Sequence, residues 1–329
     1  SFSISFGCSL ASFFMASFLY YLSLAIGNVA IAISAVGYLT PFFPWLGTGA
    51  VPLFVGVVGL IWLTTLANFG GPKVTGQIGS ITVWGVIIPV GMLCIIGWFY
   101  FKPDVFVAAW NPNNMAIGDA VAASIPLTLW AFLGMESAAQ NSDAVENPKK
   151  NVPLACMLGT MGAAVVYILS TTVIQGIVPN AELANSTAPF AVVYAQMFNP
   201  TIGKIIMALA VLACVGSLLG WQFTLSQTAK YTADGRMFPK FFAKVSAKNA
   251  PIIGMVVAGV IQTLMAVSTM SPDATAQFNK LVNLAAVTNI VPYILSISAL
   301  MVVMYKAKTE EHKFKTNLIA VFVAILYSI

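Results

Sequence analysis

Charged residues are scarce in this sequence. Of its 329 residues only 8% are Asp, Glu, Lys or Arg, whereas 59% are hydrophobic and the mean hydropathy is +0.89. Soluble domains carry about 25% charged residues, so a water-soluble globular fold is excluded. The apolar runs are long and continuous, as in 80–101, and lack the alternation of membrane β-barrel strands. The sequence therefore predicts an all-α fold, a polytopic transmembrane helical bundle.

Residues that commonly ligate metals or perform acid–base chemistry are also few. Cys8, Cys94, Cys156 and Cys214 lie far apart inside apolar runs and form no CxxC pair. The single histidine, His312, lies in a charged loop. Disulfides and metal sites are poorly supported. An enzyme would need a nucleophile–base pair or a metal cluster, so we predict neither an enzyme nor a cofactor.

The apolar runs divide into candidate membrane crossings. A crossing needs about 20 mostly apolar residues. We expect helices at 10–40, 51–69, 78–101, 117–140, 153–178, 203–230, 251–271, 279–305 and, incompletely, 316–329. The chain starts with Ser and stops within an apolar run, so we expect a piece of a longer protein. We treat 1–329 as a single transmembrane transporter domain, truncated at both ends.

The connections between these segments alternate in charge. One set of loops carries 12 of the 15 Lys and Arg residues, and the other set carries only three, Lys102, Lys204 and Lys280. Cytoplasmic loops of membrane proteins are enriched in Lys and Arg, so the richer set is predicted to face the cytoplasm. The net charge of +5 then reflects orientation in a lipid bilayer, and nucleic acid is not a predicted partner. Within the richer set, 236–245 is either a short amphipathic surface helix or a solvated loop.

Glu136 is the one acidic residue well inside a predicted crossing. A charge in hydrocarbon costs a few kcal/mol and commonly marks a transport route. No Lys or Arg lies at similar depth, so its partner is a substrate cation, a proton or a segment outside this chain. A carboxyl held neutral by helix–helix hydrogen bonds, or close enough to a helix end to reach water, is the structural alternative.

Other unusual residues lie near the middle of predicted crossings. Gly134 favours an interruption of the 117–140 helix, of the kind that exposes backbone carbonyls to cations in transporters. Trp130 and Trp221 each offer a ring to an alkyl chain or an ammonium, with ordinary packing as an equally weighted alternative. Asn28 either binds substrate or joins helices. Tyr20 and Tyr293 can donate to a carboxylate.

Several segments look similar to one known family. They are 28–38, 75–78 with 81–89, 130–136, 146–153, 176–180, 216–222 and 289–293. These motifs resemble the basic amino acid and polyamine antiporters of the amino acid, polyamine and organocation (APC) superfamily, and the resemblance runs from about residue 20 to the end. It implies a twelve-helix transporter with two inverted five-helix repeats, of which this chain would begin near the third helix. Members are often homodimers.

The resemblance also implies roles for individual residues. In substrate binding, the carbonyls of Trp130 and Leu133 would meet an ammonium and Asn28 a distal amine, with Trp221 forming a gate beneath. Tyr20, Glu136 and Tyr293 would form the cytoplasmic-side gate, and Trp130 would gate the substrate as well as stack on its carbon chain.

We therefore predict a secondary active transporter of the bacterial inner membrane that exchanges a cationic amino acid such as ornithine for a diamine such as putrescine. Lysine–cadaverine exchange, arginine–agmatine exchange and proton-coupled uptake remain as alternatives. A channel would need a continuous polar stripe through several crossings, and the sequence has none. The last alternative is an inactive fragment folded around an incomplete site.

Overall fold

The computed structural model describes residues 2–134, 147–184, 186, 188–306, 317–319 and 321–324. Its regular elements within these ranges are helices, so the all-α prediction is confirmed there. The α-helices are α1 Phe2–Leu39, α2 Ala50–Asn68, α3 Pro72–Thr82, α4 Trp84–Ile96, α5 Pro103–Ala109, α6 Ile117–Phe132, α8 Pro148–Ile177, α9 Asn180–Ala184, α10 Pro189–Met197, α11 Pro200–Asp234, α12 Ile252–Ser268 and α13 Ala274–Lys306. Three short 3-10 turns are η1 Pro44–Gly47, η2 Gly97–Tyr100 and η4 Lys240–Ala243.

Most predicted crossings correspond to one of these helices. Among the described residues, six helical segments are long and apolar enough to cross a membrane, and α6 and α12 are shorter apolar helices. The first, second, fifth, sixth, seventh and eighth predicted crossings match α1, α2, α8, α11, α12 and α13 with shifted ends. The predicted crossing at 316–329 lies largely outside the described residues.

Three expectations need correction. The predicted 78–101 helix begins at Pro72 and is divided at Val83 into α3 and α4. Segments expected to be loops contain α5, α9 and α10. The segment 236–245, expected to be either a surface helix or a solvated loop, is neither: it contains the single turn η4, and its Phe242 is buried. In each case tertiary packing overrides a local pattern that was too short to decide the structure.

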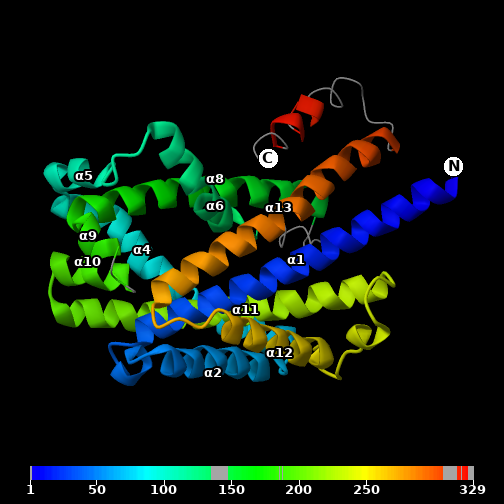
Figure 1. Ribbon diagram of the computed structural model, residues 1–329, viewed down its shortest axis with the longest axis horizontal. Coiled ribbons are helices and arrows are strands. Elements are labelled where there is room, and N and C mark those ends of the chain that lie inside the picture. The colour runs from blue at the N-terminus through cyan, green and yellow to red at the C-terminus, as the bar shows by residue number, and fades with distance from the viewer. Residues whose placement is uncertain are drawn as a thin grey trace.

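The long helix α1 is the centre of the bundle. It carries no charged residue, and an all-apolar helix is suited to burial among other helices. Figure 1 shows α1 between α13 and α11, the two helices that it contacts most extensively. The most hydropathic window of its 12–39 portion is 72% buried, whereas that of α8 is 0% buried. In the described part of the chain, α8 therefore lies at the periphery.

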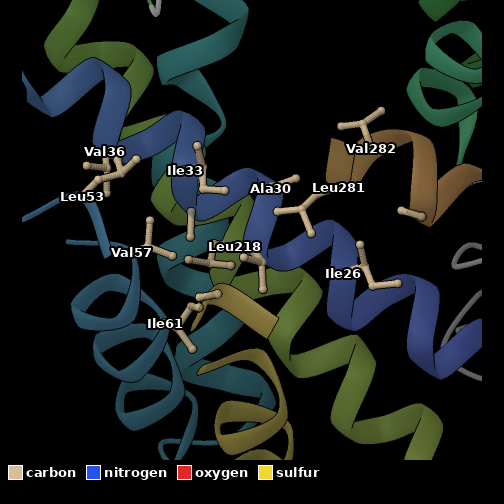
Figure 2. Packing of buried hydrophobic residues seen from close by; sticks show 14 of the residues in the cluster. Ile26, Ala30, Ile33, Val36, Leu53, Val57, Ile61, Leu218, Leu281 and Val282 are labelled. Atoms are coloured by element: carbon tan, nitrogen blue, oxygen red, sulfur yellow. The ribbon is translucent and has the colours of Figure 1, made fainter. Parts of the chain in front are cut away.

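The main apolar core forms where α1 meets its neighbours. Figure 2 shows Ile26, Ala30, Ile33 and Val36 on successive turns of α1, facing residues of α2, α11 and α13. The spacing of three or four residues places them on one helix face. The residues from the neighbouring helices are Leu53, Val57, Ile61, Leu218, Leu281 and Val282.

The loops separate into two ends of the bundle. Gly71, in the turn between α2 and α3, packs against the backbone carbonyl of Lys248, so the Lys73 loop and the α11–α12 loop meet. We call this the basic end. At the opposite end, the Lys102 N–H donates to the carbonyl of Gly176 at 2.8 Å. Both contacts agree with the charge pattern, which predicts that successive loops lie at opposite ends of the bundle.

Candidate functional site

The site begins where α6 stops. The last helical residue is Phe132, Leu133 is extended with φ −64° and ψ 144°, and Gly134 has φ +113°. Glycine adopts such a positive φ because it has no Cβ. The helix thus stops inside the predicted 117–140 span, at Leu133 and Gly134, and residues 135–140 lie outside those that the structure describes.

Backbone carbonyls at this helix end differ in their partners. The Trp130 carbonyl accepts the N–H of Leu133 at 3.2 Å, and the Ala131 carbonyl accepts the Tyr167 hydroxyl of α8 at 2.9 Å. The Leu133 carbonyl accepts no hydrogen bond from any residue that the structure describes. Ammonium groups donate up to three hydrogen bonds, and this carbonyl is an available acceptor.

Trp130 connects the end of α6 to the two central helices. Its indole Nε1 lies 3.7 Å from the position that a Cβ on Gly27 of α1 would occupy. Its ring meets Phe278 of α13 edge-on, with 5.8 Å between ring centroids. A Cβ at Gly27 would lie at an ordinary van der Waals distance from the indole, so Trp130 packs directly on α1. Trp130 is only partly buried, which leaves ring surface for another group.

Trp221 of α11 approaches the same interruption from another direction. Its ring carbons Cη2 and Cζ2 lie 2.8 and 2.9 Å from where a Cβ on Gly134 would stand. The glycine therefore serves both the backbone conformation and the approach of this ring. Trp130 is the first residue of the segment 130–134, in which α6 ends, and Trp221 contacts the last residue of that segment, Gly134.

Asn28 follows Gly27, the residue that Trp130 approaches. Its side chain is 1% exposed, and its Nδ2 has no hydrogen-bond partner. A buried amide without a partner is destabilising, commonly by about 1–3 kcal/mol, so such groups commonly serve a ligand or water. Thus Trp130, Leu133 and Trp221, predicted from distant parts of the sequence, meet at one helix end, and Asn28 is next in sequence to Gly27, which Trp130 approaches.

A separate cavity of about 850 Å³ lies at the basic end, between α1, α11 and α13. Tyr20 and Tyr293, predicted as gate residues, both line it. Tyr20 precedes Asn28 by eight residues, about 12 Å along an α-helix. The structure therefore places the two tyrosines together, and separates them from the residues around the α6 end. The other lining residues are Phe13, Ala16, Ser17, Thr228, Tyr231, Thr232, Met237, Pro292, Ser296, Ile297 and Leu300.

Some residues of these two regions were not predicted from the sequence. Gly27 and Phe278 hold Trp130, and only the position of Gly27 beside Asn28 hints at this role. Thr228, Tyr231 and Thr232 line the cavity from one face of α11, which their i, i+3, i+4 spacing indicates in retrospect. Glu136, predicted for both the binding site and the gate, lies outside the described residues.

These features define a class of protein: a multi-pass helical membrane protein whose candidate site lies at an interrupted helix, as in secondary transporters. The sequence profile of the family described as "Amino acid permease" matches residues 4–329. The chain belongs to this amino acid permease family.

Individual relatives fall into two groups. The chain is 55% identical over 317 residues to the "Putrescine transporter PotE" of Escherichia coli K12. This alignment covers 96% of this chain and 72% of that protein. It is 52% identical over 318 residues to the Haemophilus influenzae protein of the same description, with the same two coverages. The "Cadaverine/lysine antiporter" of Escherichia coli K12 is 36% identical over 288 residues, covering 86% of this chain and 65% of that protein.

Proposed function

We propose that the protein is an antiporter of the bacterial inner membrane that exchanges a cationic amino acid such as ornithine for a diamine such as putrescine. The 55% and 52% identities to two putrescine transporters support a diamine substrate. The relation to a cadaverine/lysine antiporter supports exchange with an amino acid. The lower identity of that relative, 36%, favours putrescine over cadaverine.

The observation that carries this function is the meeting of two tryptophans and the Leu133 carbonyl at the point where α6 stops. Trp130 is proposed to stack on the carbon chain shared by ornithine and putrescine. The Leu133 carbonyl is proposed to accept a hydrogen bond from an ammonium. The Trp130 carbonyl, which already accepts one hydrogen bond from the Leu133 N–H, is proposed to be a second acceptor. Asn28 is proposed to meet the distal amine through its side-chain oxygen, because a protonated amine only donates hydrogen bonds and the amide oxygen accepts them.

The gate is proposed to consist of two layers. Trp221, which covers Gly134, is the layer next to the site. Tyr20 and Tyr293 form the layer towards the basic end, because both line the cavity there. From its sequence position, Glu136 is proposed to supply the fixed negative charge that a diamine requires. Alternating access through these layers would pass one substrate at a time.

Exchange is tested with purified protein in lipid vesicles. Radiolabelled ornithine uptake is measured into vesicles preloaded with putrescine and into matched empty vesicles. We expect rapid uptake only in the preloaded vesicles. Equal uptake in both would rule out obligatory exchange and leave a uniporter or a proton-coupled permease.

A further inference from the structure

A buried hydrogen-bond relay joins three helices behind Trp221. The Thr75 hydroxyl of α3 donates to Oδ1 of Asn68 in α2 at 2.6 Å. Nδ2 of Asn68 then donates to the backbone carbonyl of Leu219 in α11 at 2.9 Å. Asn68 is 0% exposed and Thr75 is 9% exposed. The hydroxyl fixes which end of the amide faces α11, because only the amide nitrogen can donate to a carbonyl.

The relay contacts α11 just before the proposed gate. Leu219 precedes Trp221 by two residues in α11. Asn68 therefore fixes the main chain of α11 close to Trp221, whose ring extends onto Gly134. Because the main chain of α11 is fixed at Leu219, its position along the helix axis and its rotation about that axis are fixed as well. These determine where the Trp221 ring meets the α6 end.

A glycine turn anchors the other end of the relay. The Gly71 N–H donates to the Asn68 carbonyl at 2.9 Å, and its carbonyl accepts from the Thr75 N–H at 3.1 Å. The Thr75 hydroxyl also lies 3.1 Å from this carbonyl. Gly71 has φ +80°, and the carbonyl of Lys248 occupies the place where a Cβ would stand. The relay is thus fixed to the loop between α11 and α12.

We infer that Asn68 and Thr75 are positioning residues that hold Trp221 against the α6 end and thereby set the affinity for substrate. Neither residue touches the proposed site, so they act through the main chain of α11. The inference rests on the proposed role of Trp221 as the gate next to the site. A displaced ring would leave the bound substrate less enclosed while the rest of the exchange pathway keeps its structure.

The test compares Thr75→Val with two matched variants. Thr75→Val keeps the shape of the side chain and removes the hydroxyl, whereas Thr75→Ser retains a hydroxyl. Thr64→Val removes a hydroxyl that is also buried, in α2, but bonds only to Leu60 and Ile61 of its own helix. Ornithine and putrescine exchange is measured for each full-chain variant in vesicles, with KM and maximal rate determined separately.

We expect Thr75→Val to raise KM for both substrates about three- to tenfold, the effect of one lost hydrogen bond, with a smaller change in maximal rate. Thr75→Ser should restore KM, and Thr64→Val should leave it unchanged. Thr75→Val combined with Trp221→Phe should raise KM less than the product of the two single effects, because both act through one ring position. If Thr75→Val does not assemble in the membrane, Thr75→Ala is judged by the same comparison.

Two results would overturn the inference in different ways. Independent, multiplicative effects of Thr75→Val and Trp221→Phe, or equal KM changes in Thr75→Val and Thr64→Val, would reduce the relay to a structural role. A Trp221→Phe variant with unchanged exchange would remove the premise, since the proposed gate role of Trp221 would then be wrong. Exchange itself would still be established by the preloaded-vesicle experiment.

Discussion

At the scale of single residues, the site depends on small side chains as much as on large ones. Trp221 can cover the α6 end because residue 134 is glycine, whereas a Cβ at residue 27 would lie at an ordinary contact distance from Trp130. The two aromatic rings were evident from the sequence because tryptophan is unusual in mid-crossing. The role of Gly134 in admitting the Trp221 ring was less evident, since glycine is frequent in membrane helices.

Trp130→Leu is expected to weaken the binding of ornithine and putrescine alike, because both have an alkyl stem and an ammonium. A lost ring contact of this kind raises KM by about 3- to 30-fold. Concentration-dependent uptake of each labelled substrate measures the change. Trp110→Leu is the control, since Trp110 is 75% exposed and remote from the site. Unchanged KM values in Trp130→Leu would assign the ring to packing.

Gly134→Ala is expected to abolish or strongly reduce exchange. The methyl group would meet the Trp221 ring, and the φ of +113° costs a residue with a Cβ about 1–3 kcal/mol. Gly118→Ala in α6, the helix that ends before Gly134, has open space around the added methyl group and serves as the control. Both variants are assayed for exchange and for thermal unfolding in detergent. Equal activity in both would contradict the proposed contact.

Glu136→Gln is expected to impair putrescine exchange more than ornithine exchange, because a dication depends more on a fixed anion than a monocation does. The measurement is the ratio of the KM for putrescine to the KM for ornithine, determined for Glu136→Gln and for the unchanged protein. Equal loss for both substrates would instead indicate a proton-binding or folding role for this carboxyl.

At the scale of elements, long apolar runs in the sequence predict the helices, but only some of the ends and breaks of these helices could be predicted. Gly134 indicated the end of α6. The division at Val83 has no glycine or proline at that residue, and Thr82 beside it packs against Gly216 of α11, a contact that no local pattern indicates. The Asn68–Leu219 bond joins residues 151 apart in sequence, so no local pattern could indicate it.

The unpredicted helix α10 is fixed to α4 by one buried tyrosine. The Tyr194 hydroxyl donates to the Pro89 carbonyl at 2.6 Å. Burial raises the pKa of Tyr194 to about 12, so its hydroxyl keeps the proton that it donates at neutral pH. The bond holds the loop between α8 and α11 on the end of the bundle opposite to the basic end.

Tyr194→Phe is expected to lower the free energy of unfolding by about 1 kcal/mol, the net contribution of one such hydrogen bond. Thermal unfolding in detergent, followed by circular dichroism, measures the shift. Tyr100→Phe is the comparison, because the Tyr100 hydroxyl makes no hydrogen bond to the residues that the structure describes. A loss of stability equal to that of Tyr100→Phe would show that α10 is held by apolar packing alone.

At the scale of the whole molecule, exchanging a monocation for a dication moves one net charge across the bilayer. The membrane potential acts on that charge with about 2.3 kcal/mol per 100 mV. Export of putrescine against import of ornithine is therefore expected to slow when the compartment containing putrescine is made negative.

Vesicles with an imposed potassium diffusion potential provide the measurement. Ornithine–ornithine exchange moves no net charge and should not respond to the potential, which makes it the internal control. A putrescine–ornithine exchange equally insensitive to the potential would mean that a further ion accompanies one of the substrates.

The length of α11 has a consequence for how substrates arrive. Its 35 residues span about 52 Å, well beyond the roughly 30 Å of hydrocarbon, and Thr228 and Tyr231 lie in its last two turns. We therefore expect the basic-end cavity that they line to lie near the lipid headgroups. The surface potential of an anionic leaflet, about −30 mV, concentrates a dication there about tenfold and a monocation about threefold. Lipid composition would then bias which substrate first enters from that side, before any residue of the protein distinguishes the two.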